Sequence, residues 1–213
     1  MEDDNLNFKD GLKFLSDNDG VLRTVIKNTR PIAPSHRQPS FEGLVKIIVS
    51  QQLSGRAADT IFSRLEKLFC EETITPQSIR AIDDTLIKSC GISNSKVSFI
   101  RNLQIHFDEQ PNFIETLSSM EFTDMHKELI KLKGIGEWSA RIFALFHLRH
   151  PDVFAYGDNT IYTAIDTLYG EDTSTNRDKL ELLIKKWSPH NSTACILMWQ
   201  WIDSGKPTDL TTK

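Results

Sequence analysis

The amino-acid sequence predicts an all-α protein of about ten helices. Apolar residues recur at intervals of three and four positions through most of the chain, which places them on one face of a helix. No segment shows the two-residue alternation that is typical of a half-buried strand, and no internal repeat or low-complexity segment is present. A chain of 213 residues is long enough to bury a substantial core, in one domain or in two intimate lobes.

Helix start and stop signals divide the first part of the chain into separate elements. Residues 5–30 carry apolar side chains at helical spacing and are expected to form one or two helices before a proline-containing loop. Residues 41–53 are nearly all apolar, which predicts a helix in the core. Thr75-Pro76 is typical of a helix start, and Cys90-Gly91 of a helix stop. The other helices of this part are expected over 57–69, 75–87, 96–107, 112–120 and 123–132.

Two glycines separated by one residue stand between two helical patterns. The pattern of residues 123–132 ends, Gly134 and Gly136 follow, and helical periodicity resumes at Trp138, which predicts a helix, a tight hairpin and a second helix. Glycine permits positive φ and lacks the Cβ atom that would block a close approach. The N-terminus of the second helix would offer N–H groups and a positive dipole end to a phosphate. An ordinary helix–helix corner with a glycine cap fits the same pattern.

An aspartate follows this hairpin region at the start of another helix. Pro151 ends the preceding helix, and Asp158 stands directly before the helical pattern of residues 159–169. We expect Asp158 to cap that helix, which could be its whole role. The helix dipole and nearby N–H groups would also keep its carboxylate ionised, as cleavage of a nucleoside bond requires. The last helices are expected over 177–187 and 192–203.

Charge and cysteine content limit the possible functions. The net charge of −4 does not indicate a nucleic-acid binder, but residues 1–20 hold six acidic residues against two lysines, so the remainder is about neutral. A neutral body can bind DNA through a local basic face and backbone donors. Cys70, Cys90 and Cys195 are widely spaced, which suits reduced thiols and gives no zinc-ligand spacing. No apolar run reaches membrane-spanning length and no signal peptide is visible, so we expect no membrane association.

Taken together, these motifs resemble the helix-hairpin-helix DNA glycosylases (the HhH-GPD superfamily), and most closely the yeast-type alkylbase (3-methyladenine) DNA glycosylases. The resemblance covers roughly residues 41–201. Besides the hairpin and Asp158, it is carried by Ser50-Gln51-Gln52-Leu53-Ser54 within 41–58, Cys90-Gly91-Ile92 within 90–96, Trp187-Ser188-Pro189, and residues 194–199 ending in Trp199. Each motif is weak alone, and their combination is specific.

The resemblance implies a helix-hairpin-helix DNA glycosylase fold with two helical lobes and the DNA and active-site cleft between them. Residues 41–145 would form a six-helix lobe ending in the hairpin motif, residues 5–40 with 146–203 a second lobe carrying Asp158, and residues 204–213 a tail. The implied activity is that of a monofunctional alkylbase DNA glycosylase of base excision repair, without lyase activity. Such a protein would flip alkylated purines out of duplex DNA and hydrolyse their N-glycosidic bonds, as a monomer in the nucleus.

Site roles follow from the resemblance residue by residue. Asp158 is the implied catalytic carboxylate, and Trp138 and Trp199 are the implied walls of a base-stacking pocket. Trp138 stands where lyase-competent members of the superfamily have a lysine, so a Schiff base is not expected. The implied minor-groove wedge, which fills the gap left by a flipped base, consists of Gln52, Leu53 and Ser54.

The implied DNA-backbone contacts lie at the hairpin, over Lys133, Gly134, Ile135, Gly136 and Ser139. Double-stranded DNA with alkylated bases or abasic sites is the implied partner. The family also holds a monovalent cation, Na⁺ or K⁺, through hairpin carbonyls, here those of Ile130, Leu132 and Ile135. No cofactor is expected to be required, and without a close four-cysteine cluster no iron–sulfur cluster is expected.

Structural alternatives remain for these assignments. Gln52 could cap a helix while Leu53 packs inside, and the two tryptophans could be ordinary core residues. Lys96 and Arg101 could contact the DNA backbone or be solvated surface residues.

Departures from the family pattern also raise other functions. They are Asn191 in place of an arginine, Ile142 in place of a pocket tyrosine, Ala155 in place of a proline, and the segment 159–162. They favour, as an alternative, a non-catalytic or weakly catalytic protein that sculpts damaged or abasic DNA. A helical protein–protein adaptor is a minor alternative.

Overall fold

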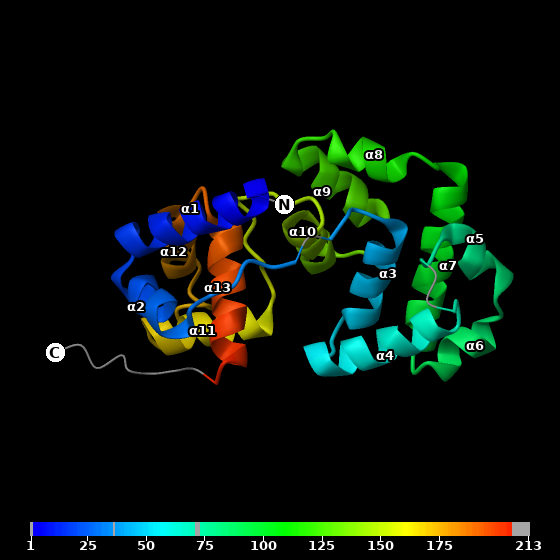
Figure 1. The fold of residues 1–213 in the computed structure, drawn as a ribbon, viewed down its shortest axis with the longest axis horizontal. Coiled ribbons are helices and arrows are strands. Elements are labelled where there is room, and N and C mark those ends of the chain that lie inside the picture. Colours follow the sequence, from blue (N-terminus) through cyan, green and yellow to red (C-terminus); the bar gives the residue numbers. More distant parts are fainter. Residues whose placement is uncertain (1, 36, 71–72, 206–213) are drawn as a thin grey trace. The chain divides into compact units, whose positions relative to one another are not determined.

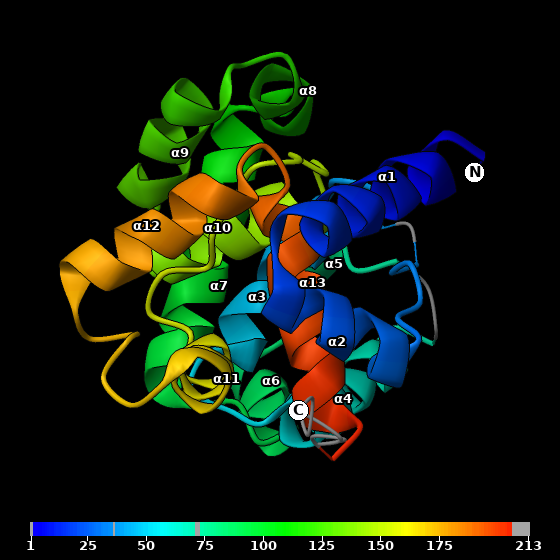
Figure 2. The ribbon, with the colours of Figure 1, turned by 90° about the vertical axis from the view of Figure 1, so that its left-hand side faces the viewer.

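The computed structural model describes residues 2–35, 37–70 and 73–205, with side chains from residue 7 onward. Most of the expected tail, residues 206–213, lies outside the described residues. The described chain contains thirteen helices and no strand, which confirms the all-α prediction (Figure 1, Figure 2). There are more helices than the expected ten or so because the predicted segments 5–30 and 75–87 each contain two. Both breaks occur at an aspartate, Asp19 or Asp83, whose carboxylate caps the next helix.

The helices form two compact units. The first unit contains α1 (Glu2–Asn18), α2 (Gly20–Thr29), α11 (Asn159–Tyr169), α12 (Arg177–Trp187) and α13 (Asn191–Asp203). The second unit contains α3 (Phe41–Ser50), α4 (Gly55–Lys67), α5 (Pro76–Ala81), α6 (Asp84–Ser89), α7 (Asn94–Glu109), α8 (Phe113–Ser118), α9 (Phe122–Lys131) and α10 (Glu137–Phe146). The described residues of this second unit therefore form eight helices, where six were expected.

The core of the first unit forms around α13. This helix is buried on nearly all sides and packs against α1, α2, α11 and α12 (Figure 1). Leu15 and Leu22 from the N-terminal pair, Ile165 from α11 and Trp201 from α13 are completely buried. A helix that is apolar all round requires such neighbours on every side, which explains why N- and C-terminal parts of the chain share one core.

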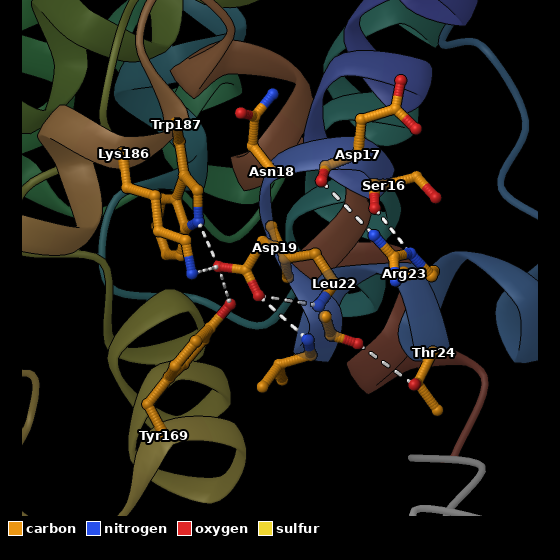
Figure 3. A network of polar contacts seen from close by, with 12 residues as sticks. Ser16, Asp17, Asn18, Asp19, Leu22, Arg23, Thr24, Tyr169, Lys186 and Trp187 are labelled. Atoms are coloured by element: carbon orange, nitrogen blue, oxygen red, sulfur yellow. Dashed lines mark hydrogen bonds and ion pairs between the residues drawn. The ribbon is translucent and has the colours of Figure 1, made fainter.

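A buried carboxylate joins the N-terminal helices of this unit to α11 and α12 (Figure 3). Asp19 is 0% exposed. Its Oδ1 accepts the N–H groups of Val21 and Leu22 at 3.0 and 3.2 Å, which caps α2. Its Oδ2 accepts three further donors: Tyr169 Oη at 3.0 Å, Trp187 Nε1 at 3.1 Å and Lys186 Nζ at 2.9 Å. Asp19 is thus a structural residue rather than part of a solvated acidic segment.

The second unit forms around α3, which packs against α4, α7 and α10. Seven of its residues are buried, which confirms the predicted core helix. The helix ends at Ser50 rather than at residue 53, because the backbone of Gln51 turns away with a ψ of 130°. The last three residues of the predicted helix are therefore part of the loop to α4. None of the described helices is both long and apolar enough to cross a membrane.

Candidate functional site

A short hairpin, residues 132–136, joins α9 to α10 as the sequence predicted. The Ile135 N–H donates to the Leu132 carbonyl at 2.9 Å and closes the turn. Gly134 has a φ of 96°, and a Cβ atom there would overlap the side chain of Phe99 on α7. Gly134 is therefore required twice, by the left-handed backbone and by the close approach to Phe99.

Gly136 differs from the expectation that both glycines serve the turn. Its φ of −100° suits any residue, and a Cβ atom at this position would meet nothing within 4 Å. Gly136 is the N-cap of α10, and no side chain makes a capping hydrogen bond there. Because Gly136 is exposed, the N-terminal end of α10 is accessible to a ligand. The fold itself does not require a glycine at this position.

The other predicted hairpin residues divide between surface and interior. Lys133 is exposed, whereas Ile135 is buried. Ser139 is 2% exposed, and its hydroxyl accepts a hydrogen bond from Gln51 at 3.0 Å. The Ser139 hydroxyl therefore faces the interior rather than a phosphate. The exposed Glu137 in the first turn of α10 pairs with His126 Nε2 at 3.0 Å, and burial lowers the pKa of that histidine.

The loop between α3 and α4 forms a tight turn whose tip is exposed. Gln51 has φ and ψ of −52° and 130°, Gln52 has a φ of 57°, and the Leu53 N–H donates to the Ser50 carbonyl at 3.2 Å. These values match a type II turn, in which the third position favours glycine or asparagine. Gln52 is exposed and Leu53 is 38% exposed, so the alternative in which Leu53 packs inside is wrong. Ser54 caps α4 by accepting the Ala57 N–H.

Asp158 caps α11, as the sequence predicted, and has an additional partner. Its Oδ1 accepts the N–H groups of Thr160 and Ile161, each at 3.0 Å. The same oxygen accepts the indole N–H of Trp199 on α13 at 3.2 Å. Trp199 is only partly exposed, and its hydrogen bond fixes both the indole ring and the carboxylate. Three donors thus converge on one carboxylate oxygen and fix the position of this side chain.

The segment that leads to Asp158 is held against the start of α13. Asp152 accepts the Ser188 hydroxyl at 2.6 Å, and the backbone N–H and side-chain amide of Asn191 at 3.2 and 2.5 Å. The Ser192 hydroxyl accepts the Val153 N–H at 3.0 Å. Asn191 is 2% exposed. The residue that departs from the family pattern at this position therefore anchors the loop that carries Asp158.

The thiol groups offer no nucleophile beside Asp158. Burial raises the pKa of Cys195 to about 12, and the charge of Asp158 acts in the same direction. Cys90 is also buried, Cys70 is exposed, and all three cysteines are free thiols. No group of three or more potential metal ligands occurs among the described histidine, cysteine, aspartate and glutamate residues.

Two basic residues that were considered as DNA contacts are engaged within the protein. Lys96 Nζ donates to the carbonyls of Val49 and Gln51, each at 2.8 Å. Arg101 pairs with Asp84 at 2.7 Å, and its guanidinium also donates to the carbonyls of Ile79 and Ile82 at the end of α5. Both therefore stabilise helix C-termini in the second unit. Sequence reasoning did not assign a role to Gln51, although it lies in the quoted motif beside the wedge residues.

The predicted site residues thus fall into two groups. The hairpin, the loop after α3 and the half-buried Trp138 belong to the second unit, and Asp158 and Trp199 belong to the first.

Comparisons with known proteins identify the family of this chain. Residues 45–190 match the family described as HhH-GPD superfamily base excision DNA repair protein. The chain is 24% identical to the alkylbase DNA glycosidase-like protein mag2 of Schizosaccharomyces pombe, over 91% of this chain and 93% of that protein. It is 28% identical to DNA-3-methyladenine glycosylase 1 of the same yeast, over 70% of this chain and 67% of that protein. Among solved structures, the S. pombe 3-methyladenine DNA glycosylase Mag1 in complex with abasic DNA superimposes with a TM-score of 0.81 at 21% identity, covering 94% of this chain and all of that one. The chain therefore belongs to the HhH-GPD superfamily of base excision DNA repair proteins.

Proposed function

We propose that the protein is a monofunctional DNA glycosylase that releases alkylated purines from duplex DNA. Family membership supports base excision repair, and relatives are named as 3-methyladenine glycosylases. The observation that carries the catalytic assignment is the fixed carboxylate of Asp158, held by its capping N–H groups and the Trp199 indole. We further propose that the protein acts as a monomer in the nucleus, where its substrate lies.

The proposed reaction breaks the bond between C1′ of the sugar and the purine nitrogen. Alkylation gives the purine a positive charge, so the bonding electron pair leaves with a neutral base and needs little help from a general acid. Positive charge develops on the sugar, where the Asp158 carboxylate stabilises it. Water then adds to C1′ and loses a proton, which leaves an abasic site.

Two aromatic residues would recognise the cationic base. Trp138 and Trp199 are both partly exposed, as stacking walls must be. Cation–π attraction to an indole face contributes about 0.5–2 kcal/mol. Because Trp138 occupies the position of the lyase lysine, we expect no covalent adduct when the protein is treated with borohydride on abasic DNA.

The hairpin would grip the DNA backbone at the start of α10. The exposed Lys133 and the N–H groups around Gly136 are the proposed phosphate donors. The carbonyls of Ile130 and Leu132 lie in and just after the last turn of α9, where carbonyls lack intrahelical partners. With the Ile135 carbonyl they suit a monovalent cation, which would add positive charge next to the phosphate.

Substituting Gly136 with aspartate tests this grip. We expect affinity for duplexes of every sequence to fall at least about fivefold, because a carboxylate at the N-cap would repel the phosphate. Stability should be unchanged, because the new Cβ atom meets open space. Fluorescence anisotropy with several duplexes measures the effect. Gly20→Asp, at the start of α2 and equally open, is the matched control. Unchanged affinity in Gly136→Asp would remove the phosphate-binding role.

Substituting Gln52 with glycine tests the wedge. The positive φ at Gln52 costs a non-glycine residue about 1 kcal/mol, so glycine should leave the free energy of unfolding equal or slightly higher. We expect the preference for abasic over intact duplex to fall several-fold, because the inserting side chain is gone. Urea unfolding and competition binding measure the two effects. A preserved preference would show that Gln52 does not insert.

Release of 3-methyladenine or hypoxanthine from duplex DNA under single-turnover conditions tests the function itself, with binding to abasic duplex measured in parallel. Base release supports the glycosylase proposal. The alternative, lesion binding with little or no excision, is favoured by two residues at positions where the family differs, the buried Ile142 and Asn191. It predicts tight abasic binding without release. No preference for DNA would instead support a protein–protein adaptor.

A further inference from the structure

We propose that Gln51 and Lys96 are positioning residues that lock the wedge loop, residues 50–54, to the phosphate-binding hairpin, residues 132–136. The inference rests on the proposed function, since it concerns how the two DNA-contacting segments act together. The two segments lie about eighty positions apart in the chain, and a single side chain, that of Gln51, bridges them.

The side-chain amide of Gln51 makes this bridge. Its Nε2 donates to the Gly134 carbonyl at 2.7 Å and to the Ser139 hydroxyl at 3.0 Å. An amide nitrogen has two protons, so both are used on the hairpin side. One acceptor belongs to the hairpin and the other to the first turn of α10. The orientation of the hairpin and of the helix N-terminus is thereby tied to Gln51.

The backbone of Gln51 is held by the side chain of Lys96 on α7. The ammonium group donates to the carbonyls of Val49 and Gln51, each at 2.8 Å. These carbonyls lie at the C-terminal end of α3, where acceptors lack helical partners and a cation is favourable. Burial lowers the pKa of Lys96, as expected for a lysine that serves the interior of the unit. Gln51 thus cannot turn without breaking contacts at both ends.

The helix α7 supports both segments. Lys96 holds the wedge loop, and Phe99, three positions further along the helix, packs against Gly134 of the hairpin. Residues three positions apart lie on the same face of a helix. The contacts therefore close on themselves, from Lys96 to Gln51, to Gly134, to Phe99 and back along α7. Gln52, the proposed wedge, is the next residue after Gln51 in the chain. A loop held in this way loses little conformational freedom when its tip inserts into DNA, so preorganisation should favour the distorted duplex.

The experiment compares affinity for abasic and intact duplexes in variants that remove each contact. Gln51→Met retains the length of the side chain and removes both donors, and Lys96→Met removes the ammonium group. The matched controls are Gln77→Met and Lys88→Met, at exposed positions of the same unit. The ratio of the two affinities is the readout, because a lost charge or a small loss of folded protein affects both duplexes alike.

We expect Gln51→Met and Lys96→Met each to lower the abasic-to-intact ratio about threefold or more, with intact-duplex affinity nearly unchanged for Gln51→Met. The controls should keep the ratio of the wild type. Combining Gln51→Met with Gln52→Gly should lower the ratio no further than Gln52→Gly alone, because Gln51 acts through its neighbour. If Gln51→Met fails to fold, Ser139→Ala removes one acceptor only and should give a smaller fall.

Three results separate the outcomes. The positioning role would be overturned if the losses in the abasic-to-intact ratio were additive in the double variant. It would also be overturned if Gln51→Met kept the wild-type ratio while Gln52→Gly lost its preference for abasic DNA. Either result would leave the proposed function intact. A wild-type protein that has no preference for abasic DNA and releases no base would overturn both.

Discussion

Substituting Asp158 with asparagine is expected to reduce excision by about a thousandfold or more, since the charge that stabilises the transition state is removed. Asparagine has the same shape, and its Oδ1 can still accept the N–H groups of Thr160 and Ile161 and the indole N–H of Trp199. Asparagine and aspartate are equally good N-caps. Folding and binding to abasic DNA should therefore remain close to wild type. Single-turnover base release at saturating protein measures the rate.

The control is Asp83→Asn, which makes the same change at another helix N-cap. Asp83 accepts the Thr85 N–H at 2.8 Å at the start of α6. Its substitution should not alter base release. An Asp158→Asn protein that excises within about tenfold of wild type would remove the catalytic role, because an electrostatic contribution of this kind is larger. An unfolded Asp158→Asn protein would mark Asp158 as a structural cap.

Substituting Asp19 with alanine is expected to destabilise the first unit by about 3–5 kcal/mol, the range for breaking a buried ion pair. The change leaves two capping N–H groups, the Tyr169 hydroxyl and the Trp187 indole without their acceptor. Buried donors without partners cost free energy beyond the lost bonds. Because whole domains are stable by only about 5–15 kcal/mol, this loss is a large fraction of the total. Urea unfolding measures it.

The control is Asp17→Ala, which removes an exposed aspartate near the end of α1, two positions before Asp19. It should change the free energy of unfolding by less than about 0.5 kcal/mol. A similarly small change in Asp19→Ala would contradict the structural role of the network.

Acid should remove the same contribution from the wild type. Burial raises the pKa of Asp19. Hydrogen bonds from Lys186, Trp187, Leu22 and Tyr169 together lower this pKa by more than burial raises it, so the net pKa lies below its usual value. A lowered folded pKa stabilises the protein above the unfolded pKa of about 3.9, and this stabilisation is lost as pH falls through the folded value. The urea concentration at the unfolding midpoint should therefore decrease when the pH is lowered below about 4. In Asp19→Asn, whose side chain cannot titrate, the urea midpoint should decrease less at low pH than in the wild type. An equal decrease would assign the acid sensitivity to other groups.

The sequence alone was sufficient for features that depend on near neighbours. The helical segments, the hairpin at Gly134 and the capping role of Asp158 were all predicted, and the structure confirms them. Each can be recognised from residues within about four positions, which periodicity and capping patterns record directly. The split at Asp19 was left open, since one or two helices were expected there, and the split at Asp83 was missed. Both residues are typical N-caps, but the apolar pattern continues across them.

Tertiary structure decided which side chains face the interior. It directed Lys96 and Arg101 to protein carbonyls and the Ser139 hydroxyl to Gln51. It also paired the Trp199 indole with Asp158 across forty-one positions and Gln51 with Gly134 across eighty-three. Spacing in a sequence contains no record of such pairs, because the partners meet only when separate helices pack together. The residue types that can do the chemistry are therefore visible in the sequence, whereas the hydrogen bonds that hold them in position arise only from the packed helices.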